Sequence, residues 1–126
     1  MKFEHFALNV PDVHASTQWY VAHLGLTVVR QMDQAPYMTF LADETGRVII
    51  ELYTNTSVAL PDYPSASPLS FHVAFVADNA LKIRERLVAA GATLVKEDLM
   101  PDGTQLVMLR DPWGVPVQLC QRAKPF

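Results

Sequence analysis

The organisation of this chain follows from Met108-Leu109-Arg110-Asp111-Pro112-Trp113-Gly114-Val115-Pro116-Val117-Gln118-Leu119-Cys120, near its end. The central Asp-Pro-Trp-Gly predicts a tight turn, because Pro112 fixes φ and Gly114 can adopt a positive φ. Alternation resumes after the turn, so Val117 and Leu119 share one face of a strand and Gln118 lies on the other. The stretch therefore predicts a turn followed by an apolar strand that carries one polar amide.

An earlier stretch, Asp43-Glu44-Thr45-Gly46-Arg47-Val48-Ile49-Ile50-Glu51-Leu52, has the same design. A glycine turn is followed by a strand in which Ile50 and Leu52 share one face and Glu51 lies on the other. Two strands of one design, one carrying Glu51 and one carrying Gln118, indicate a duplicated module.

The spacing of polar residues supports the duplication. His5 precedes Glu51 by 46 positions, and His72 precedes Gln118 by the same number. Shifts of 66 or 67 residues superpose further features of the two halves, namely Asp12 on Asp78, Gly25 on Gly91 and residues 48–52 on residues 115–119. We infer two βαβββ modules in tandem.

The elements of the first module can be placed from alternation, caps and breakers. Asp12 is expected to cap a helix that ends near Leu24, with Gly25 as its C-terminal cap. Strands are expected at residues 2–10, 26–31, 37–41 and 47–54. Residues 55–70 are small and interrupted by three prolines, which is typical of a linker without regular structure.

The second module repeats this plan. Asp78 is expected to cap a helix that ends at Gly91, with an apolar stripe formed by Leu81, Ile83, Leu87 and Val88. Strands are expected at residues 69–77, 93–96, 105–110 and 115–121.

The predicted fold class is therefore α+β, with one domain over residues 1–126. Module one spans residues 1–54, the linker residues 55–68 and module two residues 69–126. Each mostly antiparallel sheet should bury one face under its helix and curve as a half-barrel around a concave cleft. The cleft is expected to be lined by the side chains opposite the most apolar faces: His5, Glu51, His72 and Gln118.

Composition excludes several classes of partner. The chain has 126 residues, a formal net charge of −3, one cysteine and no basic cluster, so we expect no nucleic-acid partner. No apolar run approaches the roughly 18 residues of a membrane span, and Glu4 and His5 interrupt the segment that a signal peptide would need. A single cysteine, Cys120, excludes an internal disulfide and favours a cytoplasmic location, where it is expected to be a buried thiol.

Three features together resemble the vicinal oxygen chelate superfamily. They are the helix phrase Asp12-x-x-x-Ser16-x-x-Trp19-Tyr20-x-x-x-Leu24-Gly25-Leu26, the Asp111-Pro112-Trp113-Gly114 turn and the paired βαβββ halves. The superfamily includes glyoxalase I, extradiol dioxygenases, fosfomycin-resistance enzymes and bleomycin-binding proteins. The resemblance covers the whole chain, and its pattern is most similar to that of bacterial glyoxalase-I-like proteins.

The resemblance implies a metal centre whose ligands come from the first and last strands of each module. These positions are His5, Glu51, His72 and Gln118; the glyoxalase-I-like pattern has a glutamate where this chain has Gln118. The donor types are consistent with this, because two imidazoles, a carboxylate and an amide oxygen can hold Ni, Co, Mn, Zn or Fe(II) with positions left open. Two adjacent substrate oxygens could then chelate the ion, and an enediolate would be stabilised.

Charge distinguishes the roles of the two last-strand residues. An amide has no pKa near neutrality, so Glu51, and not Gln118, is the candidate for catalytic proton transfer. The resemblance also bears on glutathione, because the glutathione-using branch has an arginine at the position of Asn9. Asn55 does match a polar substrate contact of that branch, so it is a candidate substrate-binding residue.

Three functions remain open at this point. The first is a divalent-metal-dependent, glyoxalase-I-like lyase or isomerase that acts on a small substrate with vicinal oxygens. The second is a small-molecule binding or sequestering protein of the bleomycin-resistance type. The third is a ring-cleaving dioxygenase, against which Gln118 counts, because that reaction needs a last-strand carboxylate. His14 and His23 lie in the first helix and are interpreted as surface residues.

A homodimer with metal sites at its interface is also expected. A curved half-barrel sheet has an edge at each side, and exposed edges are rarely left unpaired. The resemblance favours an exchanged arrangement, in which His5 and Glu51 of one chain meet His72 and Gln118 of the other.

Overall fold

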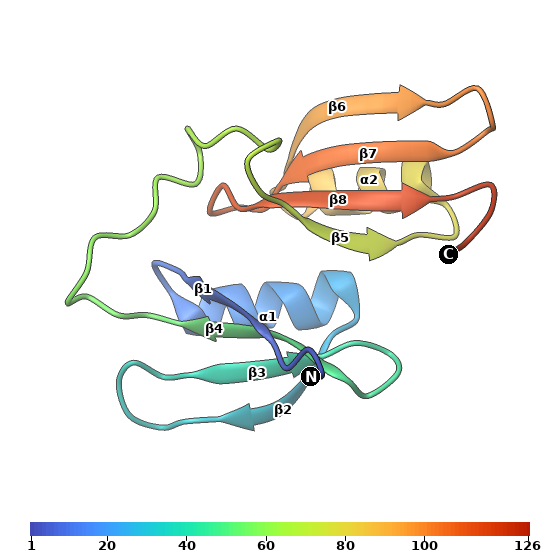
Figure 1. Cartoon of the computed structure of the whole chain (residues 1–126). Helices are drawn as coiled ribbons and strands as arrows, with labels where there is room; N and C mark the ends of the chain where they lie inside the picture. The colour runs from blue at the N-terminus through green and yellow to red at the C-terminus, as the bar shows by residue number, and fades with distance from the viewer. The chain divides into compact units, whose positions relative to one another are not determined.

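The computed structural model describes every residue from Met1 to Phe126. The chain divides into two compact units, Met1–Pro61 and Asp62–Phe126 (Figure 1). Each unit contains one helix and one four-stranded mixed sheet that is open, which confirms the predicted α+β fold with two βαβββ modules. Neither helix is long and apolar enough to cross a membrane.

The first unit builds its sheet in the strand order β1-β4-β3-β2. Strand β1 runs parallel to β4, and the other two pairs are antiparallel. Helix α1 contacts β4 and β2 and covers one face of the sheet (Figure 1). The elements are β1 (Phe6–Asn9), α1 (Val13–Leu24), β2 (Thr27–Gln31), β3 (Thr39–Ala42) and β4 (Val48–Tyr53).

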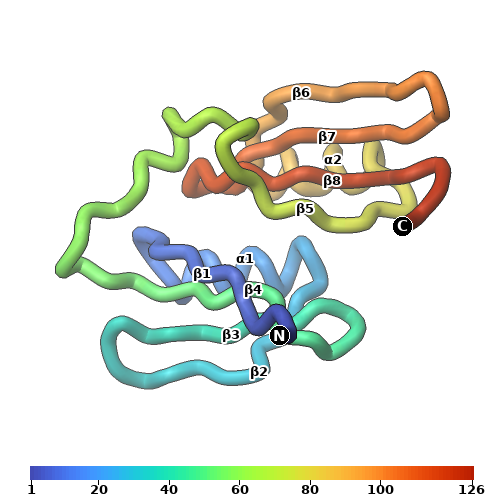
Figure 2. The backbone as a smooth tube through the Cα atoms, in the orientation of Figure 1, coloured from blue at the N-terminus to red at the C-terminus, as the bar shows by residue number.

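The second unit has the equivalent strand order, β5-β8-β7-β6, again with its edge strand parallel to the last strand. The backbone trace in Figure 2 shows each unit following the same strand–helix–strand–strand–strand path. The elements are β5 (Val73–Val76), α2 (Ala80–Ala89), β6 (Thr93–Leu99), β7 (Gln105–Arg110) and β8 (Pro116–Gln121).

In the last strand of each unit, one partly buried polar side chain lies between two buried apolar residues. Ile50 and Leu52 are fully buried, whereas Glu51 between them is only partly so. Val117 and Leu119 are buried in the same way, and Gln118 lies on the opposite face. The predicted faces of β4 and β8 are therefore confirmed.

Helix α1 begins and ends as its sequence predicts. The Asp12 carboxylate accepts a hydrogen bond from the backbone N–H of Ala15, at 3.0 Å. Gly25 adopts φ 72° in the left-handed region, and its N–H donates to the carbonyl of Tyr20. A glycine C-cap of this kind satisfies a carbonyl that the helix itself leaves free.

Helix α2 differs from its prediction by one residue. Its N-cap is Asn79, not Asp78, because the Asn79 side chain accepts from the N–H of Lys82. The buried ridge consists of Ala80 and Leu87, whereas Leu81 and Val88 are 40% and 44% exposed. Residues seven apart share a helix face, so Leu87 of the predicted stripe lies in the buried ridge as expected, whereas Leu81 and Val88 lie beside it.

The first strand of each module is shorter than alternation predicts. Strand β1 begins at Phe6 and not at residue 2, and β5 begins at Val73 and not at residue 69. Both are edge strands with a single partner, and the residues before Val73 are turned by a bond from the N–H of Ser70 to the carbonyl of Ser67. His5 and His72 consequently lie one residue ahead of their strands.

Residues 62–70 of the proline-rich segment belong to the second unit. Tyr63 is 4% exposed, and its ring lies 5.9 Å from that of Phe71. The Arg110 guanidinium, at the end of β7, donates to the carbonyls of Tyr63 and Ala66, each at 2.7 Å. This segment has no helix or strand, but it is fixed to the sheet that follows it.

The duplicated turns differ in how closely they are packed, and this difference predicts a large stability contrast. Gly46 and Gly114 both have positive φ, 78° and 91°. A Cβ on Gly114 would lie 2.6 Å from Cγ and 2.8 Å from the backbone nitrogen of Pro64, whereas a Cβ on Gly46 would meet nothing within 4 Å. Positive φ alone costs an alanine about 1–2 kcal/mol, and overpacking adds about 1–3 kcal/mol.

We therefore expect Gly114→Ala to lower the free energy of unfolding by about 3 kcal/mol and Gly46→Ala by about 1 kcal/mol. Urea denaturation of the two variants beside the wild type measures both values. Equal losses for the two variants would contradict the close packing of Pro64 on the turn.

Candidate metal centre

His5 and Glu51 form a direct pair in the first unit. Nε2 of His5 lies 3.0 Å from Oε2 of Glu51, and their side chains are 30% and 12% exposed. The sheet register explains the contact, because Ala7 is the partner of Glu51 and His5 lies two residues before it on the same side. The two residues, 46 positions apart in sequence, are thus brought together as the repeat predicts.

The surroundings of this pair are partly apolar. The ring of Phe40, the β3 partner of Glu51, meets the His5 ring edge-on with centroids 5.6 Å apart. The Glu4 carboxylate contacts Nδ1 of His5 on the other side. A carboxylate as buried as Glu51 needs a partner, and His5 supplies one by donating from Nε2. A divalent cation could replace that shared proton.

His72 and Gln118 occupy the equivalent positions in the second unit. Ala74 is the partner of Gln118 in the register of β5 and β8, as Ala7 is of Glu51. His72 is exposed, and its Nδ1 lies 2.9 Å from the carbonyl oxygen of Pro68. A carbonyl oxygen only accepts, so Nδ1 carries the proton and Nε2 of the neutral ring keeps its lone pair.

The Gln118 amide oxygen is also hydrogen-bonded. The Cys120 thiol donates to Oε1 of Gln118, at 3.3 Å. Cys120 is buried, and burial raises the pKa of its thiol, only partly opposed by Arg122. The expectation of a buried thiol is confirmed. An amide oxygen has two lone pairs, so Oε1 retains one for a further contact.

These observations test whether the chain fits a divalent metal. Within neither unit do three His, Cys, Asp or Glu side chains gather; each unit offers a pair of donors. The pairs are an imidazole with a carboxylate and an imidazole with an amide oxygen. Nitrogen and oxygen donors of these types suit a divalent first-row ion, so the donor chemistry of each pair fits such a metal.

Asn55, the candidate substrate-binding residue, lies just after β4. Its Oδ1 accepts hydrogen bonds from the N–H and the hydroxyl of Ser57, at 2.9 and 2.6 Å. Its backbone forms a reciprocal pair with the buried side chain of Asn9: Asn9 Nδ2 donates to the Asn55 carbonyl, and the Asn55 N–H donates to Asn9 Oδ1. The Asn55 amino group is therefore the part of its side chain that can donate to a substrate.

The second unit also contains a groove of about 590 Å³ beside the candidate residues. Ala74 and Val76 line it and share the strand face of His72, and Cys120 shares the face of Gln118. Arg122 and Phe126 from the C-terminal segment complete the wall, with the guanidinium carbon 4.3 Å from the centre of the ring. This volume is within the range of small-molecule sites.

The two helical histidines are separate from these pairs. His14 is exposed, and its Nδ1 lies 3.3 Å from Nε2 of Gln31. His23 is half-exposed, and its ring packs on Trp19. Neither takes part in the donor pairs.

Sequence reasoning missed three residues that support the site. Phe40 contacts His5, Pro68 orients His72, and Arg110 anchors the segment that contains Pro68. Arg110 stands in the turn-and-strand stretch that revealed the repeat, but the two carbonyls that it anchors in the segment, those of Tyr63 and Ala66, are more than forty residues away. Only Phe40 has a signal in the sequence, because the alternation of its strand places it on the same side of the sheet as Glu51, its partner on β4.

Known proteins include relatives of this chain. Residues 2–119 match the family described as the glyoxalase/bleomycin resistance protein/dioxygenase superfamily. A probable lactoylglutathione lyase from Vibrio cholerae is 28% identical over 93% of this chain and 88% of its own length. The lactoylglutathione lyase of Salmonella typhimurium is 28% identical over 96% of this chain and 93% of its own length.

Solved structures show the same fold. A glyoxalase-related enzyme from Fulvimarina pelagi superposes with a TM-score of 0.72 at 21% identity, covering 97% of this chain and 88% of that chain. A glyoxalase I mutant from Zea mays superposes with a TM-score of 0.75 at 24% identity, covering 98% of this chain and 46% of that one.

Proposed function

Since this chain belongs to the glyoxalase/bleomycin resistance protein/dioxygenase superfamily, we propose that it is a divalent-metal-dependent, glyoxalase-I-like lyase or isomerase. Its substrate would be a small molecule with two vicinal oxygens. The observation that carries the proposal is the contact between His5 and the largely buried Glu51 carboxylate. Lactoylglutathione lyases among the relatives support the reaction type.

The ligands of the proposed centre are His5, Glu51, His72 and Gln118, and the ion is Ni, Co, Mn, Zn or Fe(II). When bound, the ion would supply charge stabilisation to two adjacent substrate oxygens. Glu51 is the proposed catalytic base: it takes a proton from the carbon beside the substrate carbonyl and returns it to the neighbouring carbon. The hydroxyl proton of the substrate moves to the former carbonyl oxygen in the same conversion, and no oxidant is needed, because both protons and the electron pair stay within the substrate. Gln118 can bind but cannot move a proton.

The substrate we propose is not a glutathione conjugate. Asn9 stands where the glutathione-using branch has an arginine, and both the nitrogen and the oxygen of its side-chain amide bind the backbone of Asn55. The side-chain amide nitrogen of Asn55 is the proposed polar contact to the substrate.

The groove beside Ala74 and Val76 favours a second candidate function. A protein that sequesters a small antibiotic or metabolite needs a cavity of this kind but not a proton-transfer base. Ring cleavage by a dioxygenase is less well supported, because Gln118 occupies the place of the last-strand carboxylate.

One experiment distinguishes these functions. The purified protein is stripped of metal, reloaded with each of the five ions in turn, and assayed against α-keto and vicinal-diol substrates with and without glutathione. Metal-dependent isomerisation supports the enzyme. Tight binding of a small molecule without turnover or metal dependence supports the sequestering protein, and ring cleavage with Fe(II) supports the dioxygenase.

We propose further that the functional form is a homodimer in which each metal site takes His5 and Glu51 from one chain and His72 and Gln118 from the other. The support is that each unit supplies only a pair of donors and that β1 and β5 are sheet edges, which proteins rarely leave unpaired. Isologous pairing would give two equivalent sites in each dimer.

Mixing two inactive variants is expected to restore one site. In a heterodimer of His5→Ala and His72→Ala chains, both lesions fall in one site and the other is complete. Metal bound after mixed refolding should therefore rise from none to about one ion per heterodimer, with half the dimers being mixed. Mixtures that never recover metal, or a protein that is monomeric at micromolar concentration, would refute the shared site.

A further inference from the structure

We propose that Arg110 is a positioning residue for His72. Its guanidinium would hold the chain before His72 so that the Pro68 carbonyl fixes the imidazole with its proton on Nδ1 and its lone pair on Nε2. The inference rests on the proposed ligand role of His72, but it concerns the metal-free protein and can be tested there.

A hydrogen bond to the Pro68 carbonyl selects the tautomer of His72. Nδ1 of the ring lies 2.9 Å from the Pro68 carbonyl oxygen. Because the carbonyl offers no proton, the ring must donate from Nδ1, and the neutral form then presents Nε2 as an electron-pair donor. Hydrogen bonds of this kind from the second ring nitrogen orient metal-binding histidines in general. His5 differs from His72 in the metal-free protein, because its Nε2 faces the Glu51 carboxylate and donates to it.

The Pro68 carbonyl is held in a hydrogen-bonded turn. Residues 67–70 form a turn in which the N–H of Ser70 donates to the carbonyl of Ser67, at 2.9 Å. The N–H of Leu69 also reaches the Ser67 hydroxyl, at 3.3 Å. Pro68 itself has no backbone N–H, so its place in the turn depends on the residues on either side.

Arg110 anchors this turn on the sheet. Arg110 Nη2 donates to the carbonyl of Ala66, immediately before the turn, at 2.7 Å. Nη1 donates to the carbonyls of Tyr63 at 2.7 Å and Gly114 at 3.0 Å. One half-buried guanidinium therefore joins the loop, the end of β7 and the turn before β8. A lysine ammonium lacks the planar fork that makes such divergent contacts.

Two apolar contacts complete the anchor. Pro64 packs so closely on Gly114 that a Cβ there would overlap it. Tyr63 is buried, and its ring contacts Phe71, which directly precedes His72. Every link from Arg110 to the imidazole lies within the second unit.

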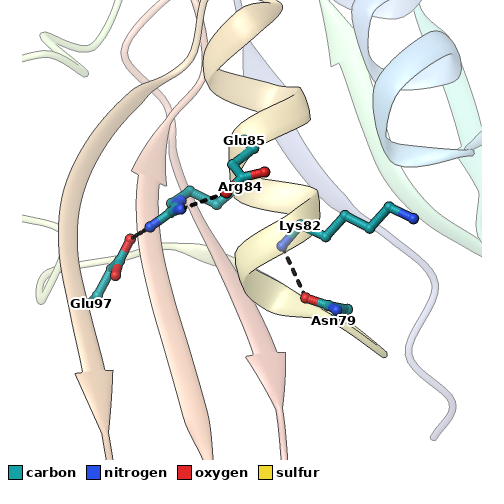
Figure 3. A network of polar contacts seen from close by, with 5 residues as sticks. All are labelled: Asn79, Lys82, Arg84, Glu85 and Glu97. Carbon is teal, nitrogen blue, oxygen red and sulfur yellow. Dashed lines mark hydrogen bonds and ion pairs between the residues drawn. The ribbon is translucent and has the colours of Figure 1, made fainter.

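The test compares Arg110→Lys with Arg84→Lys. Arg84 is a second arginine of the same unit, and its guanidinium also joins two elements, Glu97 on β6 and Glu85 on α2 (Figure 3). Its partners include none of residues 62–72. The same substitution at Arg84 thus controls for loss of a guanidinium and for a general loss of stability.

The readout is the proton position on the His72 ring, measured by nitrogen-15 NMR of the metal-free protein at a pH about two units above the ordinary histidine pKa of roughly 6.5. We expect Nδ1–H in the wild type and in Arg84→Lys, and a mixture of tautomers in Arg110→Lys. Zinc affinity, measured by calorimetry, should fall about 10–100-fold in Arg110→Lys and stay within about twofold in Arg84→Lys.

A wild-type His72 protonated on Nε2, or an Nδ1–H tautomer that persists in Arg110→Lys, would overturn the proposal. If Arg110→Lys does not fold, Arg110→Gln, which retains a planar donor, replaces it with the same expected tautomer mixture. If no variant or wild type binds zinc but the tautomer shifts as expected, the positioning role stands and the proposed metal-dependent function fails. The two failures are therefore distinguishable.

Discussion

Glu51→Gln is expected to lower the turnover number by about 10²–10⁴-fold, the range that a general base contributes. Glutamine keeps the shape and the hydrogen-bonding oxygen of the side chain, so the contact with His5 can persist. It cannot accept the substrate proton, however, and it weakens the proposed centre by removing its only carboxylate. The loss should therefore appear in turnover even at saturating metal.

Glu44→Gln is the matched control, because Glu44 is an exposed residue of the turn that precedes β4. It should leave turnover within about twofold of the wild type and stability within about 0.5 kcal/mol. Steady-state kinetics at several metal concentrations separates a proton-transfer defect from weakened binding. Full turnover by Glu51→Gln would mean that another group is the base.

Loss of either strand-leading histidine is expected to remove metal binding. His5 and His72 are two of only three strong donors in the proposed set. Mutating a residue that hydrogen-bonds to a metal ligand lowers metal affinity roughly 10–100-fold, so removing a ligand itself should lower it further. Calorimetric titration of Ni²⁺ or Zn²⁺ into the metal-free variants measures this loss. Both variants should retain the fold, because each histidine lies outside the regular strand.

The helical histidines provide the control. His14→Ala removes an exposed imidazole whose hydrogen-bond partner is Gln31, so its metal affinity should equal that of the wild type. Equal occupancy in all three alanine variants would show that the ion binds elsewhere.

The repeat could be predicted because both of its signals are local. The polar residue within an apolar strand and the turn glycine before it are visible in ten residues of sequence, and their spacing then pairs His5 with Glu51. The contact between those two side chains is confirmed at 3.0 Å. Alternation, however, does not say where a strand loses its hydrogen-bonding partner, so β1 and β5 were predicted too long.

The support of His72 could not be predicted in this way. Three carbonyl groups bind Arg110, and backbone carbonyls carry no residue signature. The cap of α2 failed for a related reason, since Asp78 and Asn79 are both good caps and only the final register of the helix selects Asn79.

The unequal packing of the two glycine turns makes the copies of the module unequally tolerant of inserted sequence. Residues 44–46 of the first turn are exposed, and a Cβ on Gly46 meets no neighbour. At residues 111–114 the turn lies against Pro64. Its Gly114 carbonyl accepts from the Arg110 guanidinium, which also anchors the loop before His72. Exposed, loosely packed turns accept peptide insertions best. We therefore expect an affinity tag or a fused domain to be tolerated between Glu44 and Thr45. The same insertion in the second turn, at residues 111–114, should disrupt the fold.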